Sequence, residues 1–232
     1  MQFIRPFFIF SILFLLLFGS SPELYADDED DEENKIYLGV GYMFDASDKR
    51  SDFENISDNR DFSSMKLPFA LEAAYYLNFG KFALGPIVSS RLTFARYEYL
   101  VGVQGNDIEI QGGVFSSHLL VGGSATFYLF GDTGDGLYGK ADFGLGFADY
   151  IALDPENLQN LSPDAQPTDL TKDYSGSGFA FSLAAGYTTE FGIDLQLIYS
   201  SFPIPIEDET SLNDNTITDG ADFLGLMIGL KI

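Results

Sequence analysis

The chain contains no cysteine and a single histidine, and only 12 of its 232 residues are lysine or arginine, against 35 that are aspartate or glutamate. Without cysteine, neither a disulfide framework nor a lipid-anchored N-terminal cysteine can form. The formal net charge of −23 argues against nucleic acid or an anionic membrane surface as a partner. After residue 26, no apolar stretch approaches the ~20 residues of a spanning helix, which excludes internal membrane helices.

The first 26 residues have the form of a secretory signal peptide, with Arg5 in a short basic region, an apolar run at 7–18 and a small residue at Ala26. An uncleaved membrane anchor is the alternative, which the shortness of the run disfavours. The acidic run DDEDDEEN at 27–34 follows, and we expect it to be a solvated, disordered leader. The sequence therefore predicts export of a domain that spans 35–232.

From Lys35 onward, apolar residues recur at every second position, which predicts β-strands that each have one apolar face. The pattern is clearest at the C-terminus, in the stretch Gly220–Ile232. Its apolar row is Leu224, Leu226, Ile228, Leu230 and Ile232. Eight such strands are expected, at 35–44, 67–77, 82–103, 108–130, 137–150, 179–191, 193–204 and 220–232. We predict that the last strand closes a barrel by pairing with the first.

The connections between the expected strands alternate in length. Short turns at 78–81, 131–136 and 192 join one set of neighbours, whereas long polar segments at 45–66, 154–178 and 207–219 join the others. An even number of antiparallel strands with short turns at one end predicts an all-β, eight-stranded up-and-down transmembrane barrel. Pro86 lies inside the third strand, where a closed barrel offers no free edge, so we expect a bulge or a water-bonded ladder there.

The second face of these strands decides which side meets lipid. It is dominated by glycine, alanine and serine, whereas a water-facing set is normally rich in lysine, glutamate, glutamine and threonine. Small residues suit the crowded interior of an eight-stranded barrel, so the apolar face should point to lipid. A soluble, lipocalin-like barrel is the alternative. Aromatic residues near the strand ends suggest interfacial girdles: Phe79, Phe82, Tyr128, Phe130 and Phe191 at the short-turn end, and Phe44, Phe94, Tyr150, Tyr199 and Phe202 at the other.

The signal peptide, the eight alternating strands and the terminal FLGLMIGLKI make the chain resemble the small OmpA/OmpX-like outer-membrane β-barrels. The resemblance is architectural and covers nearly the whole mature chain. It implies an outer-membrane location, insertion by the barrel-assembly machinery, contact with outer-membrane lipid, and a monomer. The chain departs from that family at Ile232, where an aromatic residue is typical of the assembly signal.

Alternation places a set of charged and polar residues in the lumen, namely Glu72, Arg91, His118, Lys140, Asp142, Glu190, Asp194 and Lys231. Because both signs are present, these groups can pair across a plugged interior, where an unpaired charge would be costly. The alternative is a narrow, gated ion path in which Arg91 and Glu72 are the switching pair.

A lipid A-modifying enzyme is a further alternative. Resemblance to the lipid A deacylases would require a His-x-Ser site on the lipid-facing surface, but His118 follows Ser116 and shares the inward parity. The acidic segments contain no complete D-x-[DN]-x-[DN]-G calcium loop. We therefore expect no catalytic, cofactor-binding or metal-binding residue.

The third and fourth strands are about twice the ~9–11 residues that a tilted strand needs to cross the hydrocarbon. Their hairpin, RYEYLVGVQGNDIEIQGGVF at 96–115, should therefore stand beyond the membrane. Its strand edges could be extended by another chain. The sequence predicts a non-catalytic outer-membrane barrel with a structural or surface-interaction role, in contact with an extracellular or envelope protein.

Overall fold

The computed structural model describes residues 34–48, 65–103, 106–130, 136–153, 171–208, 216–217 and 220–232. The expected signal peptide at 1–26 and all but the last residue of the acidic leader lie outside the described residues, as do most of the long polar connections. Within the described ranges, no helix is long and apolar enough to cross a bilayer.

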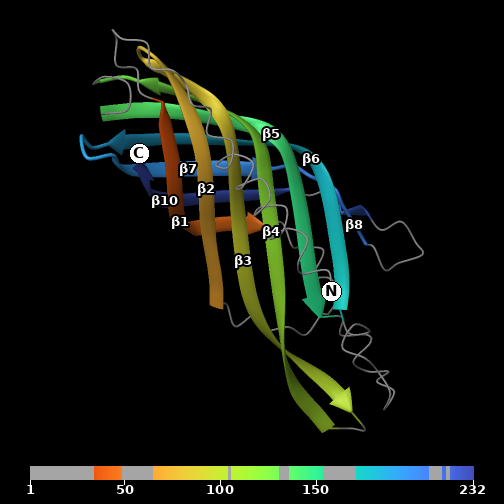
Figure 1. Ribbon diagram of the computed structural model, residues 1–232. Coiled ribbons are helices and arrows are strands. Elements are labelled where there is room, and N and C mark those ends of the chain that lie inside the picture. Colours follow the sequence, from red (N-terminus) through yellow and green to blue (C-terminus); the bar gives the residue numbers. More distant parts are fainter. Residues whose placement is uncertain are drawn as a thin grey trace.

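The described residues form one antiparallel sheet of ten strands (Figure 1). The strands are β1 (Lys35–Asp48), β2 (Met65–Phe79), β3 (Phe82–Val103), β4 (Asn106–Tyr128), β5 (Gly136–Leu153), β6 (Thr171–Thr188), β7 (Ile193–Phe202), β8 (Ile206–Asp208), β9 (Thr216–Ile217) and β10 (Ala221–Lys231). Eight of them, β1 to β7 and β10, are the strands of the barrel, and each pairs with its neighbours along the chain. Pairings of β10 with both β1 and β7, and of β5 with β6, close the barrel.

The closure between the two ends of the chain runs the length of β10. Tyr37 pairs with Lys231, and the register continues to Met43 opposite Gly225. Ile36 and Ile232 exchange two backbone hydrogen bonds of 2.8 Å, so the ladder reaches the last residue. The prediction that the C-terminal strand closes the barrel against the first strand is confirmed.

The two faces of the barrel strands have the expected orientation. Apolar side chains on the outer face are exposed, such as Leu145 at 64% and Leu226 at 59%, whereas Arg91 on the inner face is fully buried. A water-facing barrel would show the reverse distribution, because charged groups are seldom buried and large apolar patches are seldom exposed in soluble monomers. The outer surface is therefore suited to hydrocarbon.

Several strand bounds differ from those expected. The third strand matches, but β6 begins at Thr171, well before the expected Phe179, because glycine and serine obscure the alternation there. The short strands β8 and β9 fall in a stretch that the sequence suggested to be loop. β8 pairs with β6 in the register that β7 uses, so it continues β7 beyond Pro203 and Pro205.

Pro86 interrupts a ladder without adding a residue. Tyr128 donates its backbone N–H to the carbonyl of Lys81, and the β3–β4 register is unbroken, so odd-numbered β3 residues bond to β4. Pro86 therefore faces β2, and the β2–β3 pairing is interrupted between Ala74 and Leu77 while its register is unchanged. Of the two alternatives expected at Pro86, the bulge is wrong and a local interruption of the ladder is found. The register shift lies in β1 instead, at Phe44.

Candidate functional site: the polar lumen

The lumen is filled by large polar side chains that extend over small ones. Tyr37 of β1 lies against Gly39 and Gly229, and a Cβ atom at either glycine would overlap its ring. Tyr138 of β5 lies in the same way against Gly186. An eight-stranded barrel has room for little more than its own side chains, so the inward glycines provide the space for tyrosines.

The central cluster joins four charged residues from three strands. Lys140 of β5 forms ion pairs with Glu72 of β2 and, at 3.4 Å, with Asp142. Arg91 Nη2 of β3 lies 3.9 Å from Glu72 Oε2, and the Nε and Nη2 atoms of Arg91 donate to Ser200 Oγ at 3.2 and 2.9 Å. All four side chains are buried, so both signs are held away from water together.

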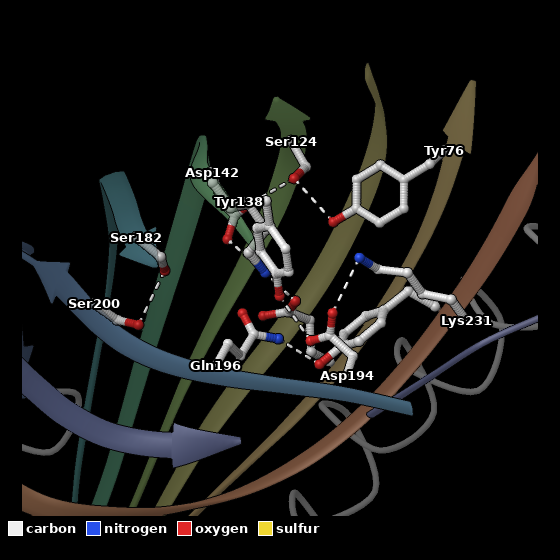
Figure 2. A network of polar contacts seen from close by, with 12 residues as sticks. Tyr76, Ser124, Tyr138, Asp142, Ser182, Asp194, Gln196, Ser200 and Lys231 are labelled. Atoms are coloured by element: carbon white, nitrogen blue, oxygen red, sulfur yellow. Dashed lines mark hydrogen bonds and ion pairs between the residues drawn. The ribbon is translucent and has the colours of Figure 1, made fainter. Parts of the chain in front are cut away.

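Hydroxyl groups extend this cluster across the barrel. Ser124 Oγ donates to Asp142 Oδ1 at 2.6 Å and lies 3.1 Å from the hydroxyl of Tyr76 (Figure 2). Ser182 donates to Ser200 at 3.0 Å, which links β6 to the residue that receives Arg91. These hydrogen bonds satisfy Asp142 Oδ1 and part of the Arg91 guanidinium, which would otherwise be costly to bury. Glu72 Oε2 and Asp142 Oδ2 accept no hydrogen bond from the described residues and are compensated by ion pairs with Arg91 and Lys140.

A second cluster lies towards the short-turn end of the barrel. Lys231 of β10 lies 3.0 Å from Asp194 Oδ2 (Figure 2). It also donates to Thr188 Oγ1 at 2.7 Å. Tyr138 donates to the other carboxylate oxygen of Asp194 at 2.7 Å. The Lys231 ammonium also lies over the rings of Tyr138 and Tyr128, at 4.3 and 5.3 Å from their centroids. A cation, an anion and two aromatic faces thus close this end.

An aromatic cluster occupies the lumen towards the opposite end. His118 Nε2 lies 2.7 Å from the hydroxyl of Tyr150, and the imidazole packs against Phe202 and Phe223 with centroids 5.2 and 5.0 Å apart. His118 and its neighbour Ser116 are both buried, and neither reaches the outer surface. The arrangement therefore lacks the lipid-facing His-x-Ser pair that lipid A deacylation would require.

Charges in the lumen balance in sign. Among the residues whose burial is described, the buried cations are Arg91, Lys140 and Lys231, and the buried carboxylates are Glu72, Asp142 and Asp194. Buried charges persist when they are paired and hydrogen-bonded, and an unbalanced set would attract a counter-ion. Among the described residues, no group of three or more His, Cys, Asp or Glu side chains could hold a metal ion.

The structure buries seven of the eight residues that were predicted to face the lumen. The exception is Glu190, which is exposed in the turn after β6; the prediction was wrong because the strand ends at Thr188. The predicted Arg91–Glu72 pair exists only at 3.9 Å, and the carboxylate of Glu72 is closer to Lys140.

The predicted aromatic girdles are partly wrong. Phe79, Phe82, Phe130, Phe191, Phe44, Phe94 and Tyr199 are exposed on the outer surface, as expected. Tyr128, Tyr150 and Phe202, however, are buried in the lumen. Parity could have identified Tyr128, because it continues the inward row of Ser124 and Thr126.

Comparison with known proteins found solved structures that are similar to this chain. No protein-family profile and no curated protein matches the chain. Among solved structures, the chain is similar to the Yersinia pestis attachment invasion locus protein Ail in complex with the heparin analogue sucrose octasulfate, with 14% identity and a TM-score of 0.47, over 86% of this chain and 99% of that chain. It is also similar to Neisserial surface protein A, with 10% identity, a TM-score of 0.40, and 86% and 97% coverage. The Pseudomonas aeruginosa outer membrane protein OprG is 11% identical, with a TM-score of 0.40 and 85% and 95% coverage. The fold assignment itself rests on the strand pairing described above.

Proposed function

We propose that this chain is a non-catalytic outer-membrane barrel with a sealed lumen, which contacts other molecules through the hairpin of β3 and β4. The observation that carries the proposal is the length of this hairpin. β2 pairs with β3 only as far as Met65 opposite Arg96, and β5 pairs with β4 only from Ala152 opposite Val114. Beyond these points, the described residues of the hairpin pair only with each other.

The part of the hairpin that has no described strand on either side consists of residues 97–103 and 106–113. At about 3.3 Å per residue, seven paired residues extend roughly 20 Å. In Figure 1, the ribbon of β3 and β4 projects past the ends of the neighbouring strands β2 and β5. It lies at the end opposite the short turns, which in outer-membrane barrels face the periplasm, so the hairpin would stand outside the cell.

The balanced lumen supports a structural role for the interior. Lys140 bridges two carboxylates, and Lys231 is held by Asp194, Thr188 and two rings, so ions would have to break several contacts to pass. A gated ion path based on Arg91 and Glu72 is the alternative. Planar-bilayer recordings of the purified barrel separate the two, because a sealed barrel stays silent at every voltage.

Membrane insertion and orientation can be tested by cysteine labelling, since the natural chain has no cysteine. Three variants sample the hairpin, the lipid-facing belt and the short-turn end: Val103→Cys, Leu145→Cys and Glu190→Cys. In intact cells, a membrane-impermeant maleimide should label only the hairpin variant. The Glu190→Cys variant should label after the outer membrane is permeabilised, and Leu145→Cys only after denaturation.

The belt variant is the decisive control, because Leu145 is 64% exposed on the protein surface. If Leu145→Cys reacts as readily as Val103→Cys, water covers the belt and the chain is a soluble barrel. If Glu190→Cys labels in intact cells and Val103→Cys does not, the orientation is reversed. A surface role further predicts that deletion of 97–113 leaves heat-modifiable gel migration intact while it abolishes binding of envelope or host ligands.

A further inference from the structure

The end of the lumen opposite the short turns is filled by apolar side chains. The rings of Phe202 and Phe223 lie 5.9 Å apart, centroid to centroid, and each contacts the imidazole of His118. Further side chains from β5 to β10 are buried in the same apolar region, namely Tyr150, Tyr174, Ile204, Ile206 and Ala221. Such a layer gives an ion no ligand in exchange for its water, and apolar constrictions exclude ions by dewetting.

Part of this layer belongs to a short segment that follows β7, residues 203–206. The inward and outward alternation of β7 continues through it, because Ile204 and Ile206 are buried whereas Pro203 and Pro205 are exposed. β6 pairs with β7 and again with the end of β8, but with no residue of this segment. The ladder on the β6 side is therefore interrupted along the whole segment.

The two prolines explain the interruption. Odd-numbered residues of β7 bond to β6, as Ile193 shows by accepting the N–H of Thr189. The prolines hold odd positions and have no N–H to donate. The N–H of Ile204, between them, is bonded at 2.8 Å to the carbonyl of Phe202. Residues 203–205 thus provide no N–H that bonds to a neighbouring strand.

Side-chain packing holds the segment in place. Ile204 lies in a notch formed by two inward glycines, where a Cβ atom at Gly146 would overlap its Cδ1 atom and one at Gly178 would touch its Cγ1 atom. At Gly176, a Cβ atom would overlap the carbonyl of Pro205, so the backbone of the segment also lies close to β6. The segment is closely packed on β6 but makes no strand pairing with it.

We propose that residues 203–206 are a hydrophobic lid, which excludes ions from the lumen while Ile204 occupies its notch and admits them when the segment lifts. Local opening is least costly where few backbone hydrogen bonds must break, and this segment has few. The lumen beneath is polar, so a small cation that passes the lid meets the carboxylates of Glu72 and Asp142. This inference rests on the sealed lumen proposed above and names the part of the seal that can move.

The test uses a cysteine reporter beneath the lid, in the full barrel in nanodiscs. Ser89 is a suitable position, because it is fully buried and its hydroxyl has no hydrogen-bond partner among the described residues. It lies one inward position closer to the short turns than Arg91, the residue opposite His118. Since the natural chain has no cysteine, Ser89→Cys is the only thiol. Silver ion in chloride-free buffer is the probe, and a thiol that has bound silver no longer reacts with maleimide after denaturation.

Two variants displace the lid by different routes, and each has a matched control. Ile204→Ala removes the side chain that fills the notch, and Ile198→Ala is the same change at a buried position of β7 that is paired on both sides. Gly176→Ala pushes against the backbone of the lid, whereas Gly139→Ala enters open space. In the Ser89→Cys background, silver should react at least about tenfold faster in the two lid variants than in their controls, because truncation or overlap destabilises only the closed lid.

Equal silver reactivity in the lid variants and their controls would overturn the proposal, as would a faster reaction in Ile198→Ala than in Ile204→Ala. Heat-modifiable migration shows that each variant is folded. The Ser89→Cys barrel with its natural lid separates the two proposals. If it reacts as fast as the exposed Glu190→Cys, the sealed interior itself is rejected, whereas a slow reaction in this barrel and in every variant rejects only the lid.

Discussion

The pair formed by Lys140 and Glu72 offers a quantitative test of the central cluster. Their side chains are 2% and 0% exposed, and each also faces one other group of opposite charge: Asp142 for the lysine and Arg91 for the glutamate. Removing one member of a buried ion pair costs about 3–5 kcal/mol, because the remaining charge is left uncompensated. We expect Glu72→Gln to lower the free energy of unfolding by about 3 kcal/mol, the lower end of that range.

The geometry also predicts that the two single substitutions lower the free energy of unfolding by different amounts. Lys140→Met should cost more, about 4–5 kcal/mol, because it strands two carboxylates whose remaining cation, Arg91, lies 3.9 Å from Glu72. The double variant restores the balance of one cation and one carboxylate, so it should lose only about 1–2 kcal/mol. The coupling between the two changes would then be roughly 5–7 kcal/mol, within the range of close charge pairs elsewhere.

The measurement is a urea titration in lipid vesicles, in which heat-modifiable migration on a gel reports the folded fraction. Exposed charges at the short-turn end supply the matched control, because Lys81→Met and Glu190→Gln remove one cation and one acid from solvent-facing turns. These changes should shift the unfolding free energy by less than about 0.5 kcal/mol. Additive losses in the buried pair, or losses as small as those of the control pair, would refute the proposed energetic role of the central cluster.

Three more predictions concern other parts of the barrel. Gly229→Ala should reduce the folded fraction because its Cβ would overlap the Tyr37 ring, whereas Gly139→Ala, which has open space, should fold normally on the same gel. His118→Phe should lower the free energy of unfolding in urea by about 1 kcal/mol, the net value of the hydrogen bond to Tyr150, and the loss should be smaller when Tyr150 is already phenylalanine. Ile232→Phe should speed accumulation of the heat-modifiable form in pulse-chase experiments, and an unchanged rate would contradict the expectation that an aromatic residue at this position favours assembly.

Periodicity predicted the barrel well because each strand has one exposed apolar face and one buried face. A strict requirement on every second residue leaves a clear pattern, and the bounds of β3 and the pairing of β1 with β10 followed from it. The same rule fails where the apolar alternation along a strand ends. The pattern weakens in β6 around Gly176 and Gly178, and β8 lies beyond two prolines, so both extensions were missed.

The partners inside the lumen could not be read from the sequence. Parity shows that Glu72 points inward, but it does not show which strand lies opposite. That depends on the relative register of strands that are distant along the chain. Lys140, its ion-pair partner, is on β5, with two strands between them. Glu190 failed for a different reason, since parity holds only while the strand lasts and β6 ends at Thr188.

The ladder between β1 and β10 has a kinetic consequence. It pairs β1 with β10, with Tyr37 opposite Lys231, so the two strands that close the barrel are separated by almost the whole described chain. Contacts between residues so distant in sequence form late, because the intervening chain must first be ordered. Until then, β1 and β10 would each expose an unpaired edge, and the incomplete sheet would be vulnerable to aggregation for as long as β10 is not paired with β1. All the hairpins can form while the barrel is still open between these two strands.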